Sequence, residues 1–340
     1  MFYHIETEER SAGGRTGTVY TLRHNGGSRA ELWPAHGFNC LRWQVKNEGQ
    51  LRDMLYVAPD WEVNPVPTRS GIPVLFPFPN RIRDGKYNFG WKDYQLPLND
   101  STSKNAIHGY APRHAWQVFG YSADQDSAWI HGDFQASVDA PETLNYWPAD
   151  YRLSLVYRLT EHALRLDATV RNLGTVPLPF GLGLHPYFRF PSAEKSIDRC
   201  QLRAPARSTW ECIDNLPTGA RQPVADEINW NTARPIGSTA LDTLYTDLGA
   251  IGQQADGLLL RATLAHSELP GMLQVWTSAS FRESVLFTPP HRQAVCIEPY
   301  TCATDAINLA EQKIDAGLLT LPAEGVWTGS VEFRWLPEPR

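Results

Sequence analysis

The sequence predicts an all-β protein, a large antiparallel β-sandwich with very few and short helices. Alternation of apolar and polar residues with a period of two recurs along the chain, and no βαβ alternation is visible. The Pro/Gly/Asn-rich stretches 64–85 and 212–238 are interspersed with strand candidates and do not look like linkers. With 42% hydrophobic residues, the 340-residue chain can bury a large core. We therefore expect residues 1–340 to form a single β-sandwich domain.

The clearest element is an antiparallel hairpin in YRLSLVYRLTEHALRLDATVRNLG, residues 151–174. Its odd-numbered positions from Tyr151 to Tyr157 share one face, and its even-numbered positions from Leu164 to Val170 share another after a turn at Thr160–His162. A second hairpin is expected in KYNFGWKDYQL, residues 86–96. Further strands are expected within 16–24, 31–45, 115–123, 127–134, 257–265, 272–278, 294–300 and 329–336. The best helix candidate is 304–317, with Asp305 as its cap.

Charge and cysteine content exclude several classes of protein. The net charge of −6 argues against a nucleic-acid binder, which would show a basic surface. No apolar run approaches the roughly 18 residues of a membrane span, and the first residues do not resemble a signal peptide. The five cysteines form no CxxC pair, which is typical of a reduced, intracellular chain. We expect a cytoplasmic protein that binds neither nucleic acid nor membrane.

Aromatic residues are abundant, with 12 Trp, 13 Tyr and 13 Phe. They suit either core packing or stacking on the apolar faces of a sugar, and composition alone does not separate the two. Several catalytic motifs are absent, among them GxxxxGK[ST], GxSxG and HExxH. GLGLHP begins like a dinucleotide-binding loop but has Pro186 in place of the third glycine. Nucleotide-dependent chemistry, serine hydrolysis and helical zinc sites are therefore not expected.

One histidine follows an unusual strand in PFGLGLHPYFRFP, residues 179–191. If this segment is extended, Phe180 and the two leucines point to one side, and Gly181, Gly183 and His185 point to the other. The glycine face would leave space for a ligand to approach the backbone. A core histidine with satisfied hydrogen bonds is the simpler alternative.

A carboxylate lies on the apolar strand AVCIEPYT, residues 294–301. Cys296 and Glu298 share one face of this strand, the flanking valine and isoleucine face the core, and Pro299 is expected to end the pairing. Apolar surroundings raise the pKa of a glutamate, which suits a general base. The alternative is a glutamate on an edge strand that faces solvent.

Two more segments offer polar side chains for a ligand. His108 precedes a glycine in the loop NAIHGYAPRHAW, and Asn80 and Arg81 follow the apolar run GIPVLFPFP. The guanidinium of Arg81 can bind hydroxyls or a carboxylate in its planar fork. The alternatives are a surface histidine and a structural ion pair.

Taken together, GIPVLFPFPNRI, NAIHGY, PFGLGLHPYF, LDTLYTDL and CIEPYTCATDAINL resemble the aldose 1-epimerase (galactose mutarotase) family, in order and at plausible separations. The resemblance runs from ELWPAHGFNCLRW to GSVEFRW and implies a galactose mutarotase-like antiparallel sandwich. It also implies an isomerase of carbohydrate metabolism that interconverts the α and β anomers of a free hexose. No cofactor and no metal are expected, and the partner would be a small-molecule sugar, bound by a monomer or a homodimer.

The resemblance also implies roles for individual residues. Glu298 would be the general base that takes the proton from the C1 hydroxyl, and His185 the general acid that protonates the ring oxygen. His108 would hydrogen-bond near that oxygen. Residues implied to contact the sugar are Asn80, Arg81, Tyr187 and Asp242, with Asp247 as the alternative to Asp242.

The loop HGYAPRHAW departs from the HGG-like loop of galactose-type members, and this leaves other functions open. The first is a hexose-6-phosphate 1-epimerase that binds phosphate through Arg81, Arg83 and Arg113. The others are a non-catalytic sugar-binding member of the superfamily, a metal site built from His108, His185 and Glu298, and a two-carboxylate glycosidase using Glu298 and Asp242.

Overall fold

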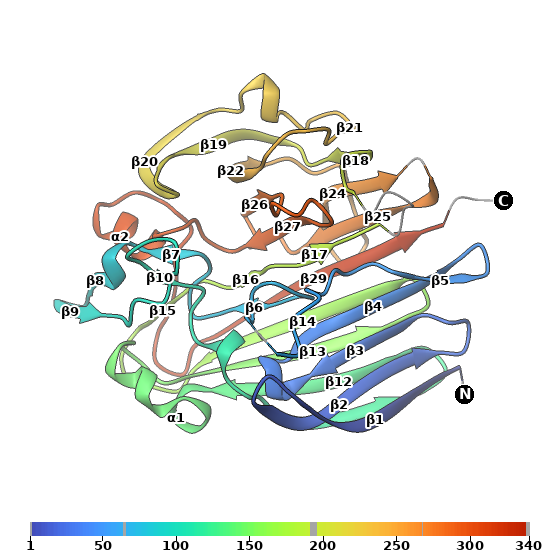
Figure 1. Ribbon diagram of the computed structural model, residues 1–340. Helices are drawn as coiled ribbons and strands as arrows, with labels where there is room; N and C mark the ends of the chain where they lie inside the picture. Colours follow the sequence, from blue (N-terminus) through green and yellow to red (C-terminus); the bar gives the residue numbers. More distant parts are fainter. Residues whose placement is uncertain (1, 64–65, 191–195, 267, 338–340) are drawn as a thin grey trace.

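The computed structural model describes residues 2–63, 66–190, 196–266 and 268–337 (Figure 1). Strands account for 52% of the structure and helices for 8%, and the sheets are antiparallel, which confirms the predicted all-β class. Within the described residues, three larger sheets are accompanied by three two-stranded ones. None of the described helices is long and apolar enough to cross a membrane.

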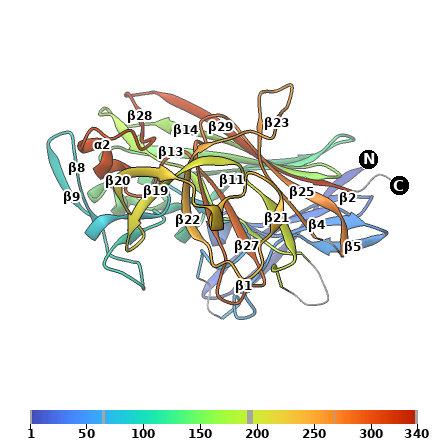
Figure 2. The ribbon, with the colours of Figure 1, turned by 90° about the horizontal axis from the view of Figure 1, so that it is seen from above.

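The five-stranded sheet contains, in spatial order, β1 (Tyr3–Ala12), β2 (Arg15–His24), β3 (Arg29–Trp33), β4 (Asn39–Asn47) and β5 (Gln50–Asp53). The ten-stranded sheet contains β11 (Gln117–Ala123), β12 (Ala128–Gln135), β13 (Tyr151–Leu159), β14 (Ala163–Asn172), β29 (Val326–Leu336), β25 (Leu269–Thr277), β24 (Leu259–His266), β18 (Cys200–Arg203) and β21 (Arg234–Pro235), with β23 (Gly252–Gln253) paired to β24. Figure 2 shows β14, β29 and β25 running across the molecule side by side, as their pairing requires.

The eight-stranded sheet contains β20 (Leu216–Pro223), β19 (Ala206–Ile213), β22 (Asp242–Leu248), β26 (Glu283–Phe287), β27 (Val295–Tyr300), β16 (Gly183–Leu184) and β6 (Val74–Leu75), with β17 (Tyr187–Phe188) paired to β27. The two-stranded sheets are β7 (Arg81–Ile82) with β10 (Ala106–Ile107), β8 (Lys86–Phe89) with β9 (Lys92–Gln95), and β15 (Leu178–Phe180) with β28 (Leu319–Leu321). The helices are α1 (Ala136–Asp139), α2 (Ala306–Glu311) and the 3₁₀ turns Pro34–His36, Arg83–Gly85, Ala111–Arg113, Pro141–Asn145 and Asp226–Ile228.

Both predicted hairpins are present. In β13 and β14, Tyr151 lies opposite Asn172, and the alternate residues of β13 are buried as the sequence pattern predicts. In β8 and β9, Tyr87 lies opposite Tyr94, and their rings stack with centroids 4.8 Å apart. Apolar cross-strand pairs on one face, such as Tyr157 with Leu166 in the first hairpin and Tyr87 with Tyr94 in the second, fix the register.

Two expectations about local structure need correction. The single strand expected over 31–45 is two strands, β3 and β4, because the segment beginning at Pro34 forms a 3₁₀ turn and Gly37 adopts a left-handed φ of 68°. Asp305 precedes α2, but its side chain makes no capping bond to the helix. It accepts instead from the backbone N–H of Arg83, at 3.0 Å, and ties the helix to the turn after β7.

Strand β27 runs through the interior of the eight-stranded sheet, between β26 on one side and β16 and β17 on the other (Figure 1). Pro299 does not end the pairing, as the sequence suggested, because it occupies a position opposite Ser284 and the strand continues to Tyr300. The carboxylate of Glu298 is therefore carried by a rigid central strand. The main hydrophobic cluster extends from Tyr3 to Trp335, and the single-domain organisation stays a prediction.

Candidate active site

His185 lies between β16 and β17, where its main-chain N–H donates to the carbonyl of Pro73 at 3.0 Å. The residue is only 7% exposed. Its ring stacks flat on Tyr187, with centroids 4.6 Å apart and an interplanar angle of 4°, and meets the ring of Phe287 edge to face at 6.2 Å. The hydroxyl of Tyr187 donates to the carbonyl of Thr68. The imidazole is thus held in one orientation from two sides.

The two glycines before His185 do not clear a floor for a ligand, contrary to expectation. A Cβ on Gly183 would lie 2.5 Å from Cδ1 of Tyr300, and one on Gly181 would lie 2.2 Å from Sγ of Cys302. The space beside the glycine backbone is therefore occupied by side chains of the protein itself. The glycines allow Tyr300 to approach the strand closely.

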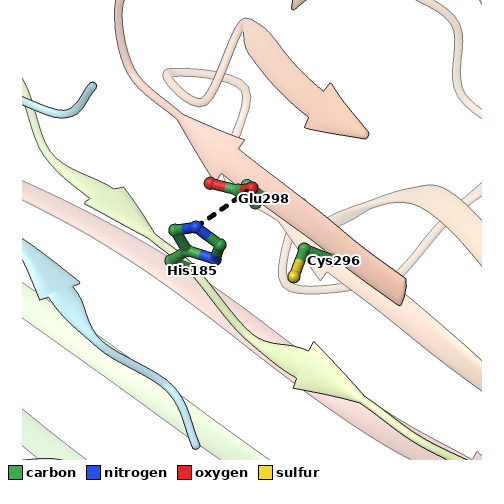
Figure 3. A group of neighbouring side chains, drawn as sticks. All are labelled: His185, Cys296 and Glu298. Atoms are coloured by element: carbon green, nitrogen blue, oxygen red, sulfur yellow. Dashed lines mark ion pairs between the residues drawn. The ribbon is translucent and has the colours of Figure 1, made fainter. Parts of the chain in front are cut away.

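Glu298 is 2% exposed and faces His185, with His185 Nε2 3.5 Å from Glu298 Oε1. Figure 3 shows the two side chains pointing toward one another, Glu298 from β27 and His185 from the link between β16 and β17. The hydroxyl of Tyr300 donates a hydrogen bond to the other carboxylate oxygen, Oε2. Cys296, two residues earlier, lies on the same face, as predicted. The alternative of a solvent-facing edge-strand glutamate is wrong.

Burial shifts the pKa values of both groups toward their neutral forms. It raises the pKa of Glu298 well above its usual value, and the charge of Asp242 adds to this, whereas the hydrogen bond from Tyr300 and the charge of Arg81 oppose it. Burial also lowers the pKa of His185 to about 3. These surroundings therefore favour a neutral imidazole beside a carboxyl group that readily holds a proton.

His108 follows β10 and adopts a left-handed φ of 67°. Its main-chain N–H donates to the carbonyl of Asn80 at 2.8 Å, and its ring lies 5.7 Å from that of His185, centroid to centroid. The following residue must be glycine, because a Cβ on Gly109 would lie 2.2 Å from the carbonyl oxygen of Phe76. Burial, followed by the charges of His185 and Arg81, lowers the pKa of His108 well below its usual value.

His108 is only 7% exposed. Its Nδ1 atom has no hydrogen-bond partner among the described residues. A buried ring nitrogen in this state is usually satisfied by water or a ligand. The structure thus brings His108, His185 and Glu298 into one buried region, as the sequence predicted.

Arg81 forms a structural ion pair, and its charge also shifts pKa values in the site. Its Nε donates to Asp100 Oδ2 at 2.7 Å, and its Nη1 donates to Asn80 Oδ1 at 3.2 Å. Burial would raise the pKa of Asp100, but hydrogen bonds from Ser103, Thr102 and Arg81 outweigh it and lower that pKa. Asp100 therefore stays ionised and holds the guanidinium in place.

The positive charge of Arg81 influences three ionisable groups of the site: His108, Asp242 and Glu298. Asp242 begins β22 and pairs with Phe287 of β26. Its charge acts on Glu298, whereas Asp247 lies 3.8 Å from Arg221 and belongs to a different surface. Of the two aspartates, Asp242 is the one beside the candidate site.

The sequence did not identify Tyr300 or Asp100 as parts of the site. Tyr300 could have been found, since it lies two residues after Glu298 and therefore on the same face of the strand. Asp100 lies 19 residues after Arg81 in the sequence, beyond the hairpin of β8 and β9, and no pattern in the sequence marks their contact. The metal site considered as an alternative has other residues in the structure, because the donor atoms that gather within 4.8 Å belong to His185, Cys296 and Glu298 and not to His108.

Comparisons with known proteins agree with this architecture. The family model for aldose 1-epimerase matches residues 18–334. A galactose mutarotase-like protein from Clostridium acetobutylicum superposes with a TM-score of 0.84, at 24% identity, over 98% of this chain and 99% of its own; this likeness shows the fold. The protein Slr1438 from Synechocystis superposes with a TM-score of 0.74, at 25% identity, over 94% of this chain and 96% of its own.

A relative is also found by sequence. The uncharacterized protein YihR of Escherichia coli K12 is 28% identical over 240 residues, which are 69% of this chain and 71% of that protein.

Proposed function

The chain belongs to the aldose 1-epimerase family, and on this premise we propose that it interconverts the α and β anomers of a free hexose. Glu298 accepts the proton of the C1 hydroxyl, and His185 delivers a proton to the ring oxygen. The hemiacetal opens, the C1–C2 bond rotates, and the ring closes on the other face with the two roles exchanged. The bond between C1 and the ring oxygen breaks and forms again with two proton transfers and no change of oxidation state, so the proposal requires no cofactor.

The observation that carries this proposal is the buried pair His185 and Glu298, whose facing atoms are 3.5 Å apart. The two oxygens that exchange protons in an anomerisation are attached to the same carbon. An acid and a base that serve both must therefore lie close together, each within about 3 Å of its oxygen. Among the described residues, no lysine or arginine lies within salt-bridge distance of the Glu298 carboxylate, whose one such partner is His185.

Sugar binding would add polar contacts to the pair. Burial favours the neutral forms of both groups, so the carboxylate and imidazolium forms need polar contacts beyond the hydrogen bond from Tyr300, and the substrate would provide them. Hydroxyl groups of the sugar would donate to Glu298, and the ring oxygen would accept from His185. The pair has one proton to share, which allows each residue to serve as acid in one direction and base in the other.

The surrounding groups would fix the sugar ring. His108 Nδ1, buried and without a partner in the described structure, would bond near the ring oxygen. Arg81 at the start of β7, Asn80 directly before it, and Asp242 at the start of β22 would bind the more distant hydroxyls. Tyr187 acts through His185, on which it stacks.

The choice of a free hexose over a 6-phosphate rests on Arg81 and Arg83, two of the three arginines considered for a phosphate group. Arg81 is tied to Asp100 at 2.7 Å, and Arg83 Nε lies 3.6 Å from Asp305 Oδ2. A phosphate group bound by either arginine would face a neighbouring carboxylate, which repels it.

Polarimetry of freshly dissolved α-glucose and α-galactose tests the proposal. We expect the chain to accelerate mutarotation above the buffer rate, and glucose 6-phosphate to compete weakly. Competition by the phosphate stronger than by free hexoses would favour the 6-phosphate epimerase. Tight sugar binding without acceleration would identify a non-catalytic sugar-binding protein.

A further inference from the structure

The proposed reaction uses His185 and Glu298 but leaves a third reactive side chain of the same cluster unused. Cys296 is fully buried, is a free thiol, and lies opposite Tyr187 and Phe287 in the sheet. Ligand atoms of His185, Cys296 and Glu298 all lie within 4.8 Å of one another (Figure 3). Imidazole, thiolate and carboxylate are the three kinds of side chain that bind zinc.

The spacing of these atoms is close to that of a zinc site. Bonds of about 2.0 Å to nitrogen and oxygen in a tetrahedron place those two ligand atoms about 3.3 Å apart. His185 Nε2 and Glu298 Oε1 are already 3.5 Å apart. A bond of about 2.3 Å to sulfur requires separations of about 3.6 Å, so Cys296 would need to close by about 1 Å at most.

A second feature directs Glu298 toward such an ion. Tyr300 donates to Oε2, which leaves Oε1 as the oxygen that faces His185. Carboxylates that bind a metal through one oxygen are commonly held by a hydrogen bond from a neighbouring group. The pair Tyr300 and Glu298 already has this arrangement.

We propose that a zinc ion binds reversibly between His185, Cys296 and Glu298 and blocks the proton transfers of this site. The thiol proton, and the proton that the buried carboxyl group of Glu298 holds, are released to solvent. The ion occupies the nitrogen lone pair and the carboxylate oxygen that the reaction needs. Zinc and sugar therefore exclude one another. The inhibition rests on the proposed function, whereas the binding of zinc does not.

Metal titration of the intact chain tests the binding. Co²⁺, used as a coloured substitute for zinc, should bind with one equivalent and give a thiolate-to-metal charge-transfer band, and zinc should displace it. In Cys296→Ser the band should disappear and the affinity for zinc should fall on the order of 100-fold, because one of three protein ligands is lost. Cys212→Ser is the matched control: Cys212 is the exposed cysteine, and its removal should leave binding unchanged.

The second arm measures anomerisation with zinc present. Zinc should raise the apparent KM for sugar in the wild type and in Cys212→Ser, and a chelator should reverse this. Cys296→Ser should keep its zinc-free activity and resist zinc. Since a buried substitution can destabilise the fold, a third measurement uses the unmodified chain: saturating sugar should weaken zinc binding.

Each outcome decides a specific part of the proposal. An unchanged affinity for zinc in Cys296→Ser, or a loss of zinc binding in Cys212→Ser, would contradict the proposed site. An affinity for zinc that saturating sugar does not change would contradict it as well. Acceleration by zinc would overturn the inhibition. Zinc binding that depends on Cys296 in a chain inactive on every hexose would support the site while contradicting the proposed function.

Discussion

The hydroxyl of Tyr300 donates a hydrogen bond to Oε2 of Glu298, while His185 Nε2 lies 3.5 Å from Oε1 of the same carboxylate. One oxygen is thus held by the protein, and the other faces the candidate acid. Because Glu298 and Tyr300 are two residues apart on β27, a single strand carries both the base and the group that orients it. Tyr300 is therefore a positioning residue for the proposed reaction.

Replacement of Tyr300 by phenylalanine should change the pH dependence of the reaction. The hydrogen bond lowers the pKa of Glu298, so its loss leaves burial and Asp242 to raise that pKa further. A base with a higher pKa is protonated over a wider range, and the acid limb of kcat against pH should move up by about one unit. Tyr245→Phe, at a buried tyrosine that bonds Trp230 and the carbonyl of Ile228, is the control. An unchanged profile in Tyr300→Phe would remove its positioning role.

His185→Asn should abolish most of the catalysed rate while the fold is retained. Asparagine roughly preserves the polar character of the site but cannot exchange a proton near neutral pH. We expect a loss of about 10²- to 10⁴-fold in kcat, with an unchanged melting temperature as the test of folding. His131→Asn, at a partly exposed histidine that pairs with Asp133, should keep full activity. A rate near that of the wild type in His185→Asn would remove this residue from the mechanism.

Gly183→Ala should disturb the site through Tyr300. The new Cβ would lie 2.5 Å from Cδ1 of Tyr300 and 2.7 Å from Cβ of Pro79, so neighbouring side chains must move. Overpacking of this kind costs about 1–3 kcal/mol of stability. Chemical denaturation and polarimetry on the same sample should show both the destabilisation and a lower rate. Gly257→Ala is the control without overpacking, because no heavy atom lies within 4 Å of the added Cβ. Alanine there strains the backbone, since φ is 87°, but it displaces no neighbouring side chain.

A second buried glutamate should control the dependence of stability on pH. Burial raises the pKa of Glu283 to about 7, against opposing hydrogen bonds from Trp210 and Thr246. The folded state therefore holds an extra proton between the unfolded pKa near 4.5 and about 7. Its contribution to stability is present below pH 4.5 and is lost as pH rises through 7.

Glu283→Gln removes this titration and keeps a neutral side chain of similar shape. At pH 8.5 the variant should be more stable than the wild type by on the order of 2–3 kcal/mol, and at pH 5 the two should be nearly equal. Urea denaturation at both pH values measures the difference. Equal effects at the two pH values would show that Glu283 does not titrate in this range.

The fold class and the first hairpin were predictable because strands such as β13 bury one face and alternate strictly. The second hairpin was predictable from its buried Tyr87 and Tyr94, which flank a turn. Strand β1 escaped prediction, since most of its residues are exposed or half-buried and its sequence YHIETEERSA lacks an apolar alternation. Strands β19 and β20 likewise carry long exposed stretches. Pairing with neighbours, rather than local preference, makes these segments strands.

Within the site, Glu298 and Cys296 could be placed on one face because a strand has a period of two. The glycines before His185 showed that something approaches the backbone closely, but the sequence could not tell that it is Tyr300 and Cys302 from the neighbouring chain segment. Contacts across many residues, such as Arg81 with Asp100, depend on how loops fold back and leave no local pattern.

The most direct test of Glu298 as the base compares the rates at which Glu298→Gln and the wild type exchange the anomers of one sugar. The sugar is the free hexose that the wild type turns over fastest. Magnetisation-transfer NMR at equilibrium measures this rate without a coupled enzyme. We expect the wild type to exchange the anomers well above the buffer rate and Glu298→Gln, folded and still able to bind sugar, to fall by about 10³-fold or more. Exchange by folded Glu298→Gln at the wild-type rate would contradict the central claim that Glu298 is the base.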